Sequence, residues 1–144
     1  MTAKPIPEGY HSITPGTSIH NCERAIEFYK NVFDAKEQVR FTSPDGKIMH
    51  CELKIGDSIF MLGDAVDQPP YHMHVMVYVN NCDVVFKRAV DAGATVKEPL
   101  ADKFYGDRNG RVTDPFGNEW YIATHKEDIS AEEMAKRAEA LMKQ

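Results

Sequence analysis

The sequence predicts an α+β fold in which two tandem βαβββ modules are followed by a C-terminal helix. Three observations lead to this fold class: an internal repeat, the same order of elements in both copies, and a capped amphipathic tail. We expect a single domain over residues 1–144, with modules at 10–63 and 71–125 and the terminal helix at 129–143.

The repeat is clearest where each module passes from its first strand into its helix. Sliding the chain by 60 residues aligns Ile19 with Val79, Asn21 with Asn81, and Cys22 with Cys82. We expect each asparagine to cap a helix whose first turn holds an acidic residue, where the helix dipole favours it. Apolar residues then recur at helical spacing in both copies: Ala25, Phe28, Tyr29, Val32, and Val85, Phe86, Ala89, Val90.

Strands are predicted on both sides of each helix. The first strands are His11–Ile19 and His72–Val79, and the segments 43–46 and 114–117 have the proline and glycine positions of type I turns. Asn109-Gly110 predicts a tight hairpin between strands 103–108 and 111–114. The remaining strands are expected at 47–55, 58–62 and 118–124.

The tail begins with a capping box formed by Ser130 and Glu133. A weak apolar stripe follows at helical spacing, made of Met134, Ala138, Leu141 and Met142. We expect this helix to pack on the domain or on a second subunit.

Composition narrows the class of protein. Lys and Arg number 17 against 22 Asp and Glu, a net charge of −5, which argues against a nucleic-acid binder. The three cysteines show no CxxC spacing, which favours a reducing compartment. The N-terminal sequence lacks a secretory apolar run, and the longest such run, 75–79, is far short of the ~20 residues that span a bilayer. We expect a cytoplasmic protein with no membrane contact.

Six segments resemble the vicinal oxygen chelate superfamily and its PhnB-like branch: 25–33, 46–50, 56–58, 104–108, 113–118 and 124–128. That superfamily includes glyoxalase I, extradiol dioxygenases, and bleomycin- and fosfomycin-resistance proteins. The resemblance implies a curled mixed sheet around a ligand cavity, and a homodimer. It also implies four metal positions in metal-using relatives, one on the first and one on the last strand of each module.

Carried over to this chain, those four positions hold few metal ligands. His74 stands at one of them, whereas the matching positions hold Thr14, Tyr121, and either Phe60 or Met61. Only His74 suits a divalent metal. We therefore expect no metal site and no other cofactor, with a divalent metal as the alternative.

Candidate ligand-binding residues follow from strand alternation. His74 shares one face of its strand with Met76 and Tyr78, and we expect that face to line the cavity, together with Thr14 and Tyr121. His50 and Glu52 share a face and form either an acid–base pair or part of a solvated surface closed by Lys54. The candidate catalytic residues are therefore His74, His50 and Glu52.

The segment 104–108 supplies two further candidates. Tyr105 offers a stacking surface and a hydroxyl, and Arg108 offers a guanidinium that pairs with anions. The alternative is a hairpin arm locked by an Asp107–Arg108 ion pair. Cys22 and Cys82 begin helices, where the dipole lowers a thiol pKa, but no base stands beside either in the sequence.

These features predict a glyoxalase- or bleomycin-resistance-like protein with a small-molecule cavity. The first hypothesis is an enzyme of the isomerase, lyase or dioxygenase type with a degenerate metal site. The alternative is non-catalytic binding or sequestration of a small molecule such as a cationic antibiotic, with which the negative net charge is compatible. A module that binds only a partner protein is the third reading.

Overall fold

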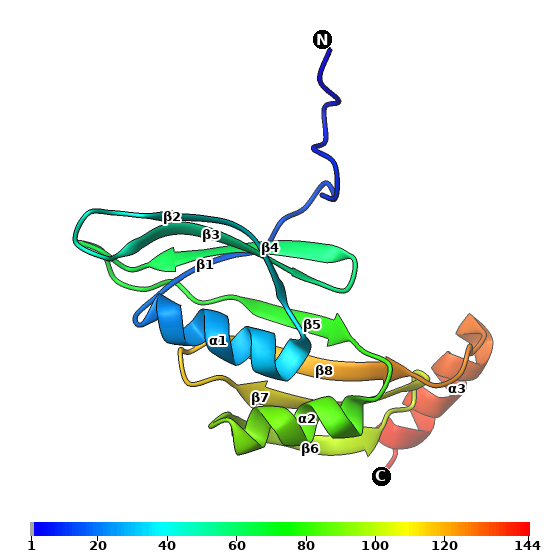
Figure 1. Ribbon diagram of the computed structural model, residues 1–144. Helices are drawn as coiled ribbons and strands as arrows, with labels where there is room; N and C mark the ends of the chain where they lie inside the picture. The colour runs from blue at the N-terminus through cyan, green and yellow to red at the C-terminus, as the bar shows by residue number, and fades with distance from the viewer. Residues whose placement is uncertain (1) are drawn as a thin grey trace. The chain divides into compact units, whose positions relative to one another are not determined.

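The chain forms two four-stranded sheets and three helices in the computed structural model, which describes residues 2–144 (Figure 1). The predicted α+β fold of two tandem βαβββ modules with a C-terminal helix is confirmed. The first module comprises β1 (Gly16–Ile19), α1 (Cys22–Phe33), β2 (Lys36–Thr42), β3 (Ile48–Ile55) and β4 (Ser58–Asp64). The second comprises β5 (His74–Tyr78), α2 (Cys82–Asp91), β6 (Thr95–Asp102), β7 (Asp107–Thr113) and β8 (Glu119–His125), and α3 (Ala131–Met142) follows.

The two sheets have the same strand order, β1-β4-β3-β2 and β5-β8-β7-β6. In the first sheet β1 runs parallel to β4, and the other neighbours are antiparallel, so the sheet is mixed. The chain divides into two compact units. The first unit holds the residues up to His74 together with the turn Asp114–Glu119, and the second holds Val75–Thr113 and Trp120–Gln144.

The repeat extends to the way each helix begins. The backbone N–H of Cys22 donates to Asp64 Oδ1 at 3.0 Å, and that of Cys82 donates to Thr124 Oγ1 at 2.9 Å. Asp64 is the last residue of β4, Thr124 is the last but one of β8, and the two are themselves 60 residues apart. The last strand of each module therefore satisfies an N–H group that a helix terminus leaves unpaired.

The two asparagine caps turn out to differ. Asn81 caps α2 as predicted, because its side chain accepts a hydrogen bond from Val84 N. The prediction for Asn21 is wrong: it has a left-handed backbone with φ 59°, and its side chain makes no cap hydrogen bond. The Asp64 carboxylate takes over that role from another strand.

Each helix packs its apolar stripe on its own sheet. In the first unit α1 lies against β3 and β4, whose Cys51, Leu53 and Leu62 are buried beneath it. In the second unit α2 packs against β7 and β6, and Val112 is buried there. Trp120 is buried. Each sheet is left with one face that no helix of its unit covers.

A buried polar network ties the turn Asp114–Glu119 into the first unit. The Tyr29 hydroxyl donates to Asp114 Oδ2 at 2.5 Å and accepts from Asn118 Nδ2 at 2.9 Å. Asn118 Oδ1 in turn accepts from Thr17 Oγ1 and Met73 N. Burial and the neighbouring Asp114 raise the pKa of Tyr29 well above its usual value, so the phenol stays a donor.

The predicted hairpin at Asn109-Gly110 is wrong. β7 runs straight through both residues, and the chain reverses at 103–106 instead, where Gly106 has a φ of 99° and Gly106 N donates to Lys103 O. Gly110 serves a close contact rather than a turn, since a Cβ there would lie 2.6 Å from Phe86 on α2. Gly110 therefore has a packing role where the local sequence predicts a turn.

The first strand of each module is also shorter than predicted. β1 begins only at Gly16, so 11–15 lie outside it, and β5 begins at His74. Pro15 has no N–H to donate to a ladder, which limits β1 on its N-terminal side. Turns are present at both predicted places, with Gly46 N donating to Ser43 O and Gly117 N to Asp114 O.

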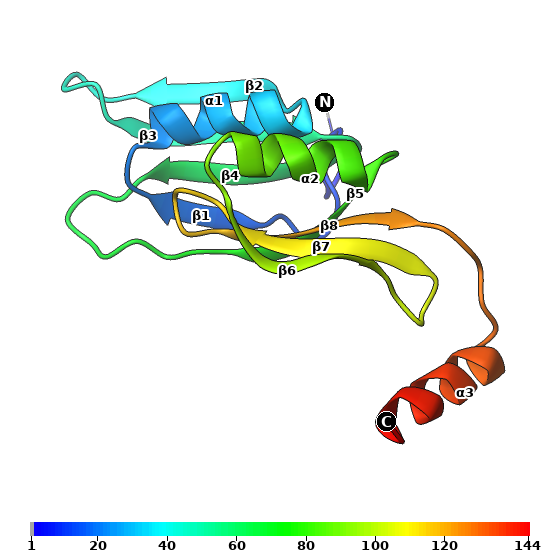
Figure 2. The ribbon, with the colours of Figure 1, turned by 90° about the horizontal axis from the view of Figure 1, so that it is seen from below.

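Helix α3 stands apart from the sheet of its own unit (Figure 2). Ser130 caps it as predicted by accepting from Glu133 N. None of its residues is buried, and its contact with the second unit includes Arg137, which donates to Phe104 O and Glu127 Oε1. Within residues 2–144, no helix has the length and apolar character needed to cross a membrane.

Candidate functional site

The helix-free face of the first sheet carries a polar pair among apolar side chains. Because Cys51 and Leu53 on β3 are buried under α1, their neighbours His50 and Glu52 point the other way. Strand pairing adds residues from β2 and β4 to the same face. We call this set the first open face: Val39, Phe41, His50, Glu52 and Met61.

The two predicted acid–base candidates are brought together there. His50 Nε2 lies 2.7 Å from Glu52 Oε2, and their side chains are 35% and 13% exposed. The Phe41 ring, 62% exposed, stacks beside the His50 ring with centroids 6.3 Å apart. The arrangement combines a flat aromatic surface with a histidine that can donate or accept a proton.

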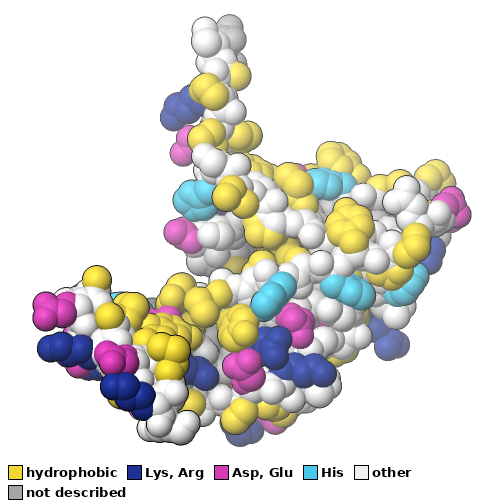
Figure 3. Space-filling view, turned by 180° about the vertical axis from the view of Figure 1, so that it is seen from behind, with side chains coloured by type: hydrophobic (Ala, Val, Ile, Leu, Met, Phe, Trp, Pro, Cys, Tyr) yellow, Lys and Arg dark blue, Asp and Glu magenta, His cyan; other side chains and the backbone are white. Residues whose placement is uncertain are grey.

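The second sheet has a corresponding face. β5 alternates as predicted, with His74, Met76 and Tyr78 exposed and the intervening valines half-buried. Tyr121 on β8 lies on this face with the Arg111 guanidinium 5.6 Å from its ring centroid. Figure 3, which shows the molecule from behind the view of Figure 1, displays several histidines and hydrophobic side chains at the surface.

A four-residue hydrogen-bonded chain crosses this face, and we call it the Asp107 cluster: Tyr78, Asp107, His125 and Asp128. Asp107 is buried, with Oδ2 accepting from the Tyr78 hydroxyl and Oδ1 paired with His125 Nδ1, both at 2.7 Å. His125 Nε2 lies 2.7 Å from the exposed Asp128. The hydrogen bonds to Asp107 and then Asp128 raise the pKa of His125, which favours the imidazolium.

Of the two candidates in 104–108, only Tyr105 lies near this cluster. Its hydroxyl accepts from Asn109 Nδ2 at 2.8 Å, and Asn109 is the fully buried neighbour of Asp107 along the same face of β7. Arg108 points to the helix side, where its Nε donates to Asp83 on α2 at 2.8 Å and its Nη1 to Asp102. The predicted Asp107–Arg108 ion pair is not what holds this hairpin arm.

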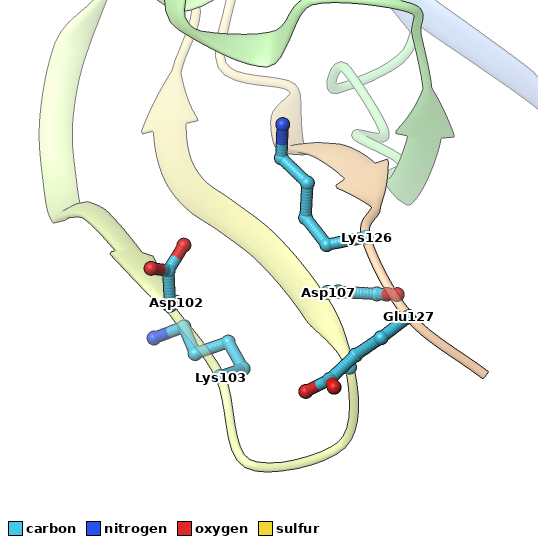
Figure 4. Close-up of a pocket in the computed structure, with 6 residues that line it drawn as sticks. Asp102, Lys103, Asp107, Lys126 and Glu127 are labelled. Atoms are coloured by element: carbon cyan, nitrogen blue, oxygen red, sulfur yellow. The ribbon is translucent and has the colours of Figure 1, made fainter. Parts of the chain in front are cut away.

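A pocket of about 290 Å³ lies at the β6–β7 turn of the second unit. It is lined by Asp102, Lys103, Gly106, Asp107, Lys126 and Glu127. Figure 4 shows Asp102 and Lys103 at the end of β6, and Lys126 and Glu127 on the segment that follows β8. Gly106 O accepts from the N–H groups of Lys126 and Glu127, which holds that segment over the turn.

The positions that hold metal ligands in metal-using relatives do not suit a metal here. Phe60 is buried, whereas Met61 lies on the first open face, so a thioether takes the position on β4. Thr14 precedes β1, and Tyr121 carries a phenol. These groups are poor ligands for divalent metals beside histidine. Nor do three His, Cys, Asp or Glu side chains gather as a metal-binding group within 2–144, so we derive no step through a metal.

Cys22, at the start of α1, behaves differently from what the dipole alone predicts, and Cys51 on β3 resembles it. Burial raises the pKa of the Cys22 thiol to about 12, and burial raises that of Cys51 to about 11. Both thiols therefore stay protonated and inert at neutral pH.

Sequence reasoning did not single out Asp107, His125 or Asp128 as site residues. The signal was present, because Asp107 lies in one segment that carries the family resemblance, and the other two lie in another such segment. Alternation from Tyr105 also predicts Asp107 on the same face. What the sequence lacked was the pairing of β7 with β8, which brings residues 18 positions apart into contact.

Comparison with solved structures shows relatives with the same fold. TioX from Micromonospora sp. ML1 superposes with a TM-score of 0.67 at 25% identity, covering 80% of this chain and 98% of that one. A PhnB protein from Bacillus cereus gives a TM-score of 0.67 at 19% identity, covering 79% and 99%. The second likeness is one of fold alone.

Sequence comparison identifies the family. An uncharacterized protein of Mycobacterium bovis is 34% identical over 137 residues, which covers 85% of this chain and 89% of that protein. Residues 18–122 match the family described as the Glyoxalase/Bleomycin resistance protein/Dioxygenase superfamily. That match spans both modules, and the chain belongs to this superfamily.

Proposed function

We propose that this protein binds a small organic molecule on the first open face, with Phe41 as the stacking surface and the His50–Glu52 pair as the polar contact. One observation carries the proposal: a 62% exposed aromatic ring on the edge strand β2 lies beside a 2.7 Å histidine–carboxylate pair on the neighbouring strand β3. An open sheet face that only meets water normally carries polar side chains. Apolar surface left uncovered in a folded protein marks a binding site for another molecule.

Membership of the superfamily supports this reading, because its members bind small molecules. The pair also gives the bound molecule a group that can polarise it, since a neutral imidazole both donates and accepts. An enzyme that converts the bound molecule and a protein that only binds it would therefore use the same residues. They differ in whether the molecule leaves unchanged.

The first prediction tests the face directly with a Phe41→Ala variant. We expect small molecules that raise the melting temperature of the wild type in a thermal-shift screen to lose most of that shift in the variant, because the stacking surface is gone. Phe41 is exposed, so folding should be little affected. Val84→Ala, which removes an exposed apolar side chain from α2, is the matched control and should keep the shifts.

Native mass spectrometry of the same samples separates the remaining alternatives. A ligand recovered with its mass unchanged indicates binding or sequestration, and a new mass indicates turnover. Cationic glycopeptides belong in the screen, because the net charge of −5 would attract them. A doubled protein mass would reveal the homodimer that we expect. Equal ligand shifts in Phe41→Ala and the wild type would rule out the first open face as the binding site.

A further inference from the structure

The two carboxylates that hold His125 are unequal partners. Asp107 is only 4% exposed on the strand β7. Its carboxylate also accepts a hydrogen bond from the Tyr78 hydroxyl. The Asp128 side chain is fully exposed, and His125 is the one partner that the structure gives its carboxylate within 2–144. A buried carboxylate with two hydrogen-bond partners stays in place, whereas an exposed ion pair is weak and exchanges readily with solvent ions.

Asp107 therefore fixes the His125 ring on its buried side. Asp128 covers the exposed side of the ring and can be replaced by another carboxylate. His125 Nδ1 faces Asp107, which fixes the ring, and its Nε2 faces outward to Asp128. With Nδ1 committed to Asp107, the outward Nε2–H is a donor ready for any carboxylate that takes the place of Asp128.

The surroundings suit a ligand with an aromatic or apolar body. Tyr78 and Met76, two residues apart on the same face of β5, are 59% and 41% exposed, which is unusual for side chains of this kind in a sheet. Tyr105 adds a donor, because Asn109 Nδ2 bonds to its hydroxyl oxygen and leaves the hydroxyl hydrogen to point elsewhere. Asn109 Oδ1 is a further buried acceptor without a hydrogen-bond partner in the described chain.

We propose that the Asp107 cluster binds the carboxylate of a small aromatic acid at His125 Nε2, and that Asp128 is the internal carboxylate which the bound acid displaces. The ring of the acid lies over Tyr78 and Met76, and Tyr105 donates to its second oxygen. The inference rests on the proposed function in one respect, that sheet faces of this protein bind small molecules. It adds a second site and the chemical class of its ligand.

The charge state of His125 agrees with this site. Its raised pKa favours the imidazolium, a stronger donor to a carboxylate than a neutral ring. Exchange of Asp128 for a ligand carboxylate leaves the local charge unchanged. Removal of Asp128 without a ligand leaves the outward N–H unpaired, so the variant should bind acids more tightly than the wild type.

The experiment compares phenylacetate with its uncharged analogue phenylacetamide by isothermal titration on the full chain. In Asp128→Ala we expect phenylacetate to bind roughly two- to fivefold more tightly than to the wild type, the value of one exposed ion pair. Phenylacetamide binding should not change. Asp57→Ala is the matched control, because Asp57 is also highly exposed and lies 3.8 Å from a histidine, His11, in the other unit.

A second measurement keeps the test independent of folding. In the wild type, phenylacetate should shift the side-chain NMR signals of His125 but leave those of His11 in place. Adding His125→Gln to Asp128→Ala should reduce phenylacetate affinity to that of phenylacetamide.

Three outcomes would overturn the inference: equal tightening in Asp57→Ala, equal binding of acid and amide, or no shift of His125. If other small molecules from the screen still bind, the proposed function survives such a result. If nothing from the screen binds to the protein, the proposed function itself fails.

Discussion

The two histidine–carboxylate pairs of this protein look alike but are built differently. His50 and Glu52 are neighbours on one strand, and both side chains keep some contact with solvent. His125 and Asp107 come from adjacent strands, and the carboxylate is buried and also bonded to Tyr78 from a third strand. Both pairs have the same 2.7 Å separation.

The difference shows that distance alone does not define what a pair can do. The His50 side chain is 35% exposed and can turn to water, so the His50–Glu52 contact breaks more easily than that of Asp107. The Asp107 carboxylate has no such freedom, because burial makes its hydrogen bonds costly to lose. The first pair suits an adaptable contact to a ligand, and the second suits a fixed one.

The largest expected effect comes from breaking the buried carboxylate. Asp107→Ala should lower the free energy of unfolding by roughly 2–3 kcal/mol, because two hydrogen bonds to a buried charged group are lost. Glu52→Ala should cost below about 1 kcal/mol, since its partner turns to solvent. Urea unfolding of both variants measures the gap, and equal losses would remove the distinction between the pairs.

The next prediction concerns pH and sharpens the comparison through His125. The groups around its ring are Asp107 on β7, with Tyr78 of β5 behind it, and Asp128 with Lys126 on the segment after β8. The hydrogen bond to Asp107 is the largest single cause of the raised pKa, and the hydrogen bond to Asp128 is the next. NMR titration should therefore show a greater fall in the His125 pKa in Asp107→Ala than in Asp128→Ala.

The sign of the stability effect follows from that raised pKa. A histidine with a higher pKa in the folded than in the unfolded state stabilises the fold fully below its ordinary value of 6.5 and loses this contribution as pH rises through the folded value. The difference in unfolding free energy between wild type and His125→Gln should therefore be larger near about pH 5.5 than near about pH 8.5. A larger difference at the higher pH would contradict the imidazolium assignment.

A smaller effect than that of Asp107→Ala is expected from Tyr78→Phe. It removes one hydroxyl donor to Asp107 and keeps the exposed ring, so we expect a loss of about 1 kcal/mol in unfolding free energy. The affinity for phenylacetate should fall only slightly, because the stacking surface remains. Chemical denaturation and titration of one preparation measure both quantities. A loss of unfolding free energy as large as that of Asp107→Ala would show that the Tyr78 hydroxyl, and not His125, supplies most of the stabilisation in the cluster.

Local signals predicted much of the fold because they depend on neighbouring residues. The cap at Asn81, the two turns and the capping box at Ser130 are each a few residues long, and all are present. Predictions failed where a distant segment decided the outcome. Gly110 was assigned to a hairpin because its contact with Phe86 on α2 is invisible locally, and Asn21 lost its capping role to Asp64 on β4.

The candidate site divides in the same way. The His50–Glu52 pair could be predicted, because alternation along one strand places residues two apart on one face. The face of the second sheet on which the Arg108 side chain lies could not be predicted. It depends on where the hairpin turns and on the contact with Asp83 of α2.

The sequence by itself determined the two-module architecture, because a repeat at 60 residues and its turn and cap residues act over short stretches of chain. The tertiary structure alone decided which carboxylate meets which histidine in the second unit. The pairing of β7 with β8 buries Asp107 between Tyr78 and His125, and no local pattern encodes that contact. Burial of a charged group is a property of the assembled sheet, and it separates the fixed pair from the adaptable one.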